Sequence, residues 1–118
     1  MKLKVYVYQN CDTCRKALKY LDARGVKYEL VPIRDRPPTR AELKRMSKLY
    51  GGNVRKLFNS SGQDYKQLNL KDKLPGLSED EAIALLAGNG NLVKRPFVLT
   101  EKGGRVGFNE ADWETLLK

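Results

Sequence analysis

Hydrophobic and polar residues alternate along two short stretches near the N-terminus of the 118-residue chain, over residues 2–8 and 26–33. Leu3, Val5 and Val7 occupy every second position of the first stretch, and Val26, Tyr28 and Leu30 do so in the second, a pattern that is typical of β-strands. Between them, from residue 11 or 12 to about residue 24, apolar side chains recur at helical spacing, and Gly25 follows where a helix commonly ends. A strand, a helix and a second strand in this order predict two parallel strands joined by a right-handed crossover.

The middle of the chain, about residues 37–90, has the pattern of several short helices. Thr39 and Ser78 are each followed three residues later by glutamate, which predicts a helix start with a capping box. Further short helices are expected over residues 54–58 and around residues 64–68. The residues expected on the buried face of the helix after Thr39 are Leu43, Met46, Leu49 and Tyr50.

The C-terminal part of the chain has the pattern of a β-hairpin followed by a helix. Residues 97–100 form a short apolar stretch, Gly103-Gly104 predicts a tight turn, and residues 105–108 are expected to return as a strand. Asn109 is expected to cap a last helix. The residues expected on the inner face of this helix are Trp113, Leu116 and Leu117.

This element order predicts a single α/β domain over residues 1–118, with a mixed sheet (β-α-β, then β-β-α) interrupted by a helical insertion at about 37–90. A chain of this length can bury one sizeable core, and 41% hydrophobic with 31% charged residues is typical of globular proteins. No apolar stretch is long enough to cross a bilayer, and the N-terminus is too short and polar for a signal peptide. We therefore expect a cytoplasmic protein without a membrane association.

The chain carries 23 Lys and Arg residues against 14 Asp and Glu, a net charge of +9. Such a charge attracts anions, whether oxyanions, nucleic acid or an acidic protein surface. The basic residues are scattered along the sequence and no known nucleic-acid-binding motif accompanies them, so the sequence does not favour nucleic-acid binding.

Cys11 and Cys14, the two cysteines of the chain, form a CxxC sequence where the first predicted strand gives way to the first predicted helix. The chain has no histidine, which excludes a Cys-His nucleophile pair and histidine metal ligands. A structural zinc site usually needs four ligands, so a metal here would require carboxylates or a second chain. Two unrelated buried cysteines are the other alternative. Their position favours a redox-active thiol pair, and we expect no bound metal or cofactor.

The two cysteines are expected to differ in reactivity. At the start of a helix, Cys11 meets unpaired backbone N–H groups and the positive end of the helix dipole, which favour its thiolate. Arg15 and Lys16 add positive charge and Asp12 partly opposes them. Cys14 shares a helix face with Leu18 and should be less exposed. We therefore expect Cys11 to attack and Cys14 to resolve the resulting mixed disulfide.

Four segments give the chain a resemblance to a known family: Tyr8–Ala17, Leu57–Gly62, Arg95–Phe97 and Val106–Asn109. Together they resemble the arsenate reductase family of the glutaredoxin-coupled type, which also contains Spx-type transcription regulators and uncharacterised relatives. The resemblance covers nearly the whole chain. It implies a thioredoxin-like sheet with a helical insertion, in which Pro96 faces the CxxC loop and follows a cis peptide bond.

The resemblance also implies residue roles. Cys11 matches the cysteine that attacks arsenate, and Arg95 matches one of three arginines that bind the oxyanion. The positions of the other two arginines hold Ser61 and Phe108, which should weaken arsenate binding by several kcal/mol at about 1.5–3 kcal/mol per charged hydrogen bond. Cys14 has no counterpart in the single-cysteine reductases and matches the Spx-type and uncharacterised branches. The nearby basic residues that could compensate are Lys56, Lys66 and Arg105.

The sequence thus predicts an arsenate reductase-like thiol-disulfide oxidoreductase that acts on an oxyanion or a disulfide. The reductant implied by the resemblance is glutathione or glutaredoxin, with thioredoxin as a further candidate. The residues expected to carry the reaction are Cys11, Cys14 and Arg95, and those expected to contact substrate are Asn10, Arg15, Arg95 and Pro96. The alternative is a redox-sensing transcription regulator that binds RNA polymerase and uses the CxxC pair as a switch.

Overall fold

The computed structural model describes residues 2–118, and backbone contacts divide the chain into two units. The first, here called the sheet unit, is made of the residues up to 32 together with residues 95–118. The second, here called the helical unit, comprises residues 33–94 and contains the whole insertion predicted at about 37–90. That the two units act as a single domain stays a prediction.

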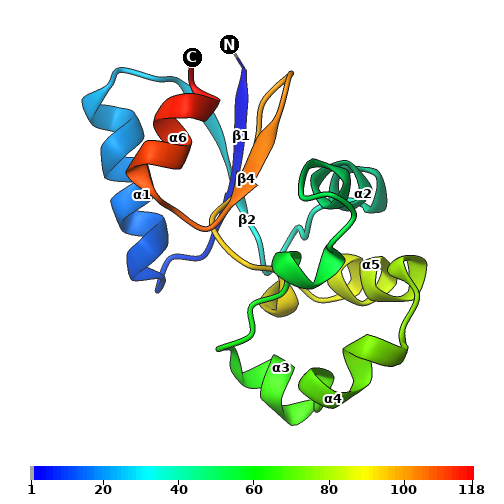
Figure 1. The fold of residues 1–118 in the computed structure, drawn as a ribbon. Coiled ribbons are helices and arrows are strands. Elements are labelled where there is room, and N and C mark those ends of the chain that lie inside the picture. The colour runs from blue at the N-terminus through cyan, green and yellow to red at the C-terminus, as the bar shows by residue number, and fades with distance from the viewer. Residues whose placement is uncertain (1) are drawn as a thin grey trace. The chain divides into compact units, whose positions relative to one another are not determined.

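The sheet unit is built on four strands in the order β2-β1-β3-β4. Strand β1 (Leu3–Val7) lies inside the sheet, parallel to β2 (Tyr28–Pro32) and antiparallel to β3 (Phe97–Leu99). Strand β4 (Gly104–Val106) pairs antiparallel with β3 at one edge (Figure 1). The predicted fold class is confirmed: β-α-β, a helical insertion, then β-β-α around a mixed sheet.

The predicted hairpin turn at Gly103-Gly104 is wrong in position, because Gly104 is already the first residue of β4. The chain reverses earlier, and the Thr100 hydroxyl closes the turn by accepting the backbone N–H groups of Lys102 (3.2 Å) and Gly103 (2.9 Å). A hydroxyl that bonds nearby backbone groups can thus do what the sequence pattern assigned to glycine. The returning strand also ends before residue 108, since Gly107 adopts a positive φ of 74°.

Helices α1 (Asp12–Ala23) and α6 (Glu110–Leu116) cover the same face of the sheet (Figure 1). The apolar face predicted for α1 packs on the aliphatic residues of β1, and the Trp113 ring is fully buried among them. The Trp113 indole N–H donates to the Gly107 carbonyl at 3.1 Å, so this ring buries no unpaired donor. The buried residues of this core are Leu3, Val5, Val7, Cys14, Ala17, Leu21, Val98 and Trp113.

The helical unit consists of short helices. They are α2 (Arg40–Leu49), α3 (Gln63–Gln67), α4 (Leu70–Lys73) and α5 (Glu79–Gly88), with 3₁₀ turns over Val54–Leu57, Leu74–Gly76 and Gly90–Leu92. Both predicted capping boxes are present: Thr39 caps α2 and Ser78 caps α5. Helix α4 and the last two 3₁₀ turns were not predicted, because segments of three or four residues are too short to show a period.

The predicted buried face of α2 needs one correction. Leu43 and Met46 are fully buried, but Leu49 is 44% exposed. Six residues after Leu43, Leu49 lies about 120° away from it around the helix. The buried position is taken by Ser47, whose hydroxyl donates to a carboxylate oxygen of Glu79 at 3.1 Å.

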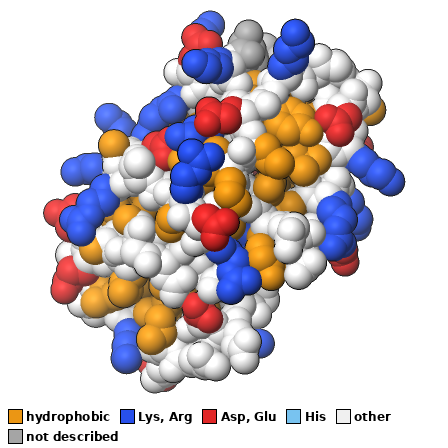
Figure 2. Space-filling view, turned by 180° about the vertical axis from the view of Figure 1, so that it is seen from behind, with side chains coloured by type: hydrophobic (Ala, Val, Ile, Leu, Met, Phe, Trp, Pro, Cys, Tyr) orange, Lys and Arg blue, Asp and Glu red, His pale blue; other side chains and the backbone are white. Residues whose placement is uncertain are grey.

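The surface carries charges of both signs. On the face that Figure 2 presents, Lys and Arg side chains are interspersed with Asp and Glu side chains. Within residues 2–118, none of the helices is both long enough and apolar enough to cross a membrane.

Candidate functional site

Cys11 is the N-cap residue of α1, with an extended backbone (φ −113°, ψ 111°). Its Sγ accepts the backbone N–H of Cys14 at 3.3 Å, and its own N–H donates to the Tyr8 carbonyl at 3.2 Å. The side chain is partly exposed. A sulfur that receives a helix N-terminal N–H is in a position that stabilises negative charge, so the predicted place of Cys11 is confirmed.

Cys14 lies one turn further along α1 and is buried, with 1% of its surface exposed. Burial raises the pKa of its thiol from 9.0 to about 12, and a hydrogen bond with the Cys11 side chain raises it as well. A backbone hydrogen bond with Tyr8 and the positive charge of Arg95 act in the opposite direction. At neutral pH Cys14 is therefore a protonated thiol, next to a more exposed partner. The predicted difference in exposure is confirmed.

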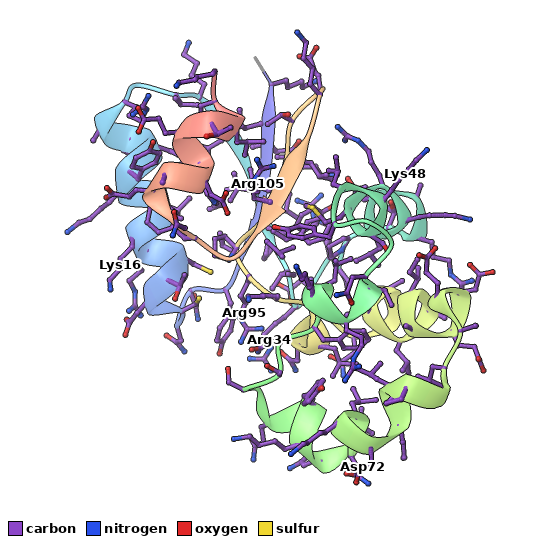
Figure 3. The ribbon with its side chains drawn as sticks, in the orientation of Figure 1. Lys16, Arg34, Lys48, Asp72, Arg95 and Arg105 are labelled. Atoms are coloured by element: carbon purple, nitrogen blue, oxygen red, sulfur yellow. The ribbon has the colours of Figure 1, made fainter. Side chains whose placement is uncertain are left out.

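Arg95 and Pro96 connect to β3, and the peptide bond between them is cis. The Arg95 guanidinium lies over the Tyr8 ring, 5.1 Å from its centre, on the side of the sheet unit where α1 begins (Figure 3). Its Nη1 atom is buried and has no hydrogen-bond acceptor among residues 2–118. A buried cationic N–H group without a partner is costly, so this atom offers a donor to an incoming anion.

Asn10 and Arg15, two predicted substrate contacts, both bond to residues close by in the sequence. The Arg15 guanidinium forms an ion pair with Asp12 and donates to the Gln9 carbonyl at 3.1 Å. The Asn10 amide donates to the Tyr8 hydroxyl at 3.4 Å. These contacts hold the loop before α1, and much of the Arg15 charge is already met by a carboxylate.

Tyr8 is the residue of this site that the sequence did not single out. Its carbonyl accepts the N–H of Cys11, its hydroxyl accepts from Asn10, and its ring lies beneath Arg95. The strand pattern placed Tyr8 only on the polar side of β1. Its position three residues before Cys11, where a turn carbonyl would bond the nucleophile's N–H, is the signal that could have identified it.

Phe108, at a position where the resemblance implied an arginine, belongs to an aromatic cluster of the sheet unit. Its ring packs edge-on against Tyr20 (5.5 Å between ring centres) and Trp113 (5.2 Å). Arg105, a predicted substitute, donates to the Gly104 carbonyl at 2.8 Å and lies 3.7 Å from an Asp112 carboxylate oxygen. Phe108 therefore brings no positive charge to the site, and the charge of Arg105 is already paired with Asp112.

Three further residues named from the sequence belong to the helical unit. The Ser61 hydroxyl donates to the Asn59 side-chain oxygen at 3.2 Å. The Lys56 ammonium lies 5.8 Å from the centre of the Tyr50 ring. Lys66 is exposed on α3. Participation of these residues in anion binding stays a prediction.

Acidic and thiol groups do not gather into a metal site in the described part of the chain. Between residues 2 and 118, no three Cys, Asp or Glu side chains lie close enough to share an ion. The groups that the start of α1 offers for chemistry are two thiols and the guanidinium of Arg95.

The sequence and the fold are similar to those of known proteins. The model of the ArsC family matches residues 6–116. The uncharacterized protein YusI of Bacillus subtilis is 43% identical over 114 residues, covering 97% of both chains. The crystal structure of a putative ArsC family related protein from Bacteroides fragilis superposes with a TM-score of 0.92 at 48% identity, covering 98% of both chains. The fold is therefore the thioredoxin-like fold of ArsC proteins, as predicted.

Relatives with assigned functions are more distant. An arsenate reductase of Neisseria meningitidis is 32% identical and covers 90% of both chains. The global transcriptional regulator Spx of Listeria innocua is 26% identical and covers 90% of this chain and 79% of its own.

Proposed function

The chain belongs to the ArsC family, and from this premise we propose that it is a thiol-disulfide oxidoreductase in which Cys11 is the nucleophile and Cys14 the resolving thiol. The observation that carries the proposal is the contrast between the two sulfurs. Cys11 is partly exposed at the cap of α1, and Cys14 is buried and hydrogen-bonded to it. Such a pair separates attack from resolution.

With a disulfide substrate, the Cys11 thiolate attacks one sulfur and the substrate S–S bond breaks. One half of the substrate leaves as a thiolate, and the other half stays bonded to Cys11 as a mixed disulfide. Forming this bond removes the negative charge on Cys11 that had raised the pKa of Cys14. Cys14 can then lose its proton to the leaving thiolate.

In the second step, the Cys14 sulfur attacks Cys11 Sγ and the mixed disulfide breaks. The second half of the substrate leaves as a thiolate and a Cys11–Cys14 disulfide remains. The protein has then given up two electrons, which glutathione, glutaredoxin or thioredoxin must return. These thiols operate in the cytoplasm, where we place the protein.

With arsenate, the same two sulfurs suffice. The Cys11 thiolate displaces one hydroxyl group of arsenate, which takes up a proton from solvent and leaves as water, and an S–As bond forms. Arg95 is the group that would bind the remaining oxygens. Cys14 then attacks Cys11 Sγ, the S–As bond breaks, and its electron pair reduces arsenic(V) to arsenic(III). With Ser61 and Phe108 at the other two arginine positions, we expect arsenate to bind weakly.

Two assays test the proposal: reduction of a small disulfide such as bis(2-hydroxyethyl) disulfide, and reduction of arsenate, each with glutathione and glutaredoxin. Cys11→Ser should abolish turnover in both. Cys14→Ser should accumulate a mixed disulfide visible by mass spectrometry. Thr13→Ser, an exposed change between the two cysteines in the first turn of α1, is the matched control and should retain activity. A wild-type protein that turns over neither substrate would refute the enzymatic proposal.

The relationship to Spx supports a second candidate, a redox-sensing regulator that binds RNA polymerase. In this role Cys11 and Cys14 would form a disulfide that alters binding rather than turning over a substrate. Recovery of polymerase subunits from lysate by the oxidised or the reduced protein, but not equally by both, would favour the regulator. Equal or absent recovery, together with turnover in the assays above, would favour the enzyme.

A further inference from the structure

The net positive charge of the chain is concentrated around α2. Residues 34–56 contain eight Lys or Arg residues and two Asp or Glu residues, which gives this segment +6 of the total charge of +9. Helix α2 runs through the middle of the segment, from Arg40 to Leu49. A surface with this local excess attracts an anionic partner whatever the chemistry of the thiols.

Arg40, Lys44 and Lys48 form a row along α2, at four-residue spacing. All three are exposed, and none forms an ion pair with any residue between 2 and 118. The rise of a helix places successive members about 6 Å apart. The opposite side of α2 is buried through Leu43, Met46 and Ser47, and Figure 3 shows Lys48 on the side of α2 away from α5.

An apolar side chain adjoins this basic row. Leu49, which the sequence pattern had placed in the core, is 44% exposed and follows directly after Lys48. Arg45, which is also exposed, lies one helical turn before Leu49 on the same neighbouring row. The outer surface of α2 therefore combines a line of cations with one exposed leucine side chain at the end of the helix.

We propose that this surface of α2, made of Arg40, Lys44, Lys48 and Leu49, binds an acidic amphipathic helix of a partner protein. Carboxylates at four-residue spacing on such a helix would face the basic row, and an apolar residue between them would cover Leu49.

The exposed Leu49 side chain favours a protein over a nucleic acid as this partner. Phosphates would pair with the basic row but would gain nothing from Leu49, whereas an amphipathic helix uses both. Single-stranded nucleic acids also need aromatic platforms on which bases stack. The aromatic residue next to this surface, Tyr50, has its ring against the Lys56 ammonium.

The test uses the full-length reduced protein and a fluorescein-labelled helical peptide with glutamates at every fourth position and leucines beside them. Fluorescence anisotropy at about 50 mM salt, where exposed charges are weakly screened, gives the affinity. Lys44→Glu with Lys48→Glu should weaken binding about tenfold or more. Leu49→Ser should weaken it to a smaller extent. Circular dichroism confirms that each variant is folded.

The matched control is Lys71→Glu with Lys73→Glu, which makes the same change in net charge on exposed positions of α4. It should leave most of the affinity intact. Equal losses in the two double variants would overturn the proposal, because binding would then depend on total charge alone. The proposal would also be overturned if the wild type does not bind the peptide. A higher affinity for a DNA duplex than for the peptide, together with an unchanged peptide affinity in Leu49→Ser, would overturn it as well.

Discussion

At the scale of single residues, the two thiols show how position in one helix sets chemistry. Cys11 and Cys14 are three residues apart, yet one caps α1 from outside and the other lies in the core. The capping sulfur receives a backbone N–H, while the buried sulfur is surrounded by aliphatic side chains that disfavour charge. The difference in exposure between Cys11 and Cys14 therefore comes from α1 itself, and the contacts of Arg95 and Tyr8 add to it.

The buried thiol of Cys14 should make stability fall at high pH. Its pKa is raised from 9.0 to about 12 in the folded chain, so the unfolded chain releases this proton first as pH rises. The resulting stabilisation is fully present below about pH 9 and is lost at up to about 1.4 kcal/mol per pH unit between pH 9 and 12. Urea unfolding of the reduced wild type and of Cys14→Ala across this range measures the difference in slope.

The comparison isolates Cys14 because both proteins keep Tyr28, whose pKa burial also raises. Parallel curves of unfolding free energy against pH for the two proteins would contradict the prediction. Cys14→Ala should be less stable at every pH because the substitution leaves a cavity in the core, but this loss does not change the slope of unfolding free energy against pH.

At the scale of elements, the beginning and end of the helical unit meet backbone to backbone. A Cβ atom at Gly90 would lie 1.9 Å from the Ile33 carbonyl oxygen, far inside any allowed contact. Gly90 opens the last 3₁₀ turn of the unit, and Ile33 is its first residue. Only glycine lets these two segments pack this closely.

Gly90→Ala should therefore lower the free energy of unfolding by about 2–3 kcal/mol, because the backbone of one segment must move to admit the methyl group. Gly88→Ala is the matched control: it lies at the end of α5 and a Cβ there meets nothing within 4 Å. It should be neutral or stabilise the protein by up to about 1 kcal/mol. Urea unfolding measures the free energy of unfolding of both variants. Similar changes in Gly90→Ala and Gly88→Ala would refute the packing argument.

At the scale of the whole molecule, the sheet depends on segments that are far apart in the sequence. Pairing β1 with β3 closes a loop that contains the entire helical unit. Closing a flexible loop of this length costs roughly 4 kcal/mol of chain entropy. The contact between Gly90 and Ile33 holds the ends of the folded helical unit together, which removes most of this cost.

We therefore expect the two units to unfold in one transition. Trp113, the single tryptophan of the sequence, is buried in the sheet unit and reports on it by fluorescence. Far-ultraviolet circular dichroism is dominated by helices, most of which belong to the helical unit. Urea curves from the two probes should coincide. A fluorescence midpoint that differs from the dichroism midpoint would show that the units unfold separately.

The sequence by itself determined the order of the elements, the fold class and the difference between the two cysteines. These features depend on local signals: alternating aliphatic residues, helical spacing, and caps such as Thr39 and Ser78 that bond groups three residues away. The N-cap position of Cys11 and the burial of Cys14 follow from the same helix period. Interactions within one turn of chain are the ones a linear pattern can express.

Only the tertiary structure decided which distant groups meet. It brought Arg95 onto the ring of Tyr8, 87 positions earlier in the chain. It also placed Phe108 in an aromatic cluster. These outcomes depend on packing between elements that no short window of sequence contains.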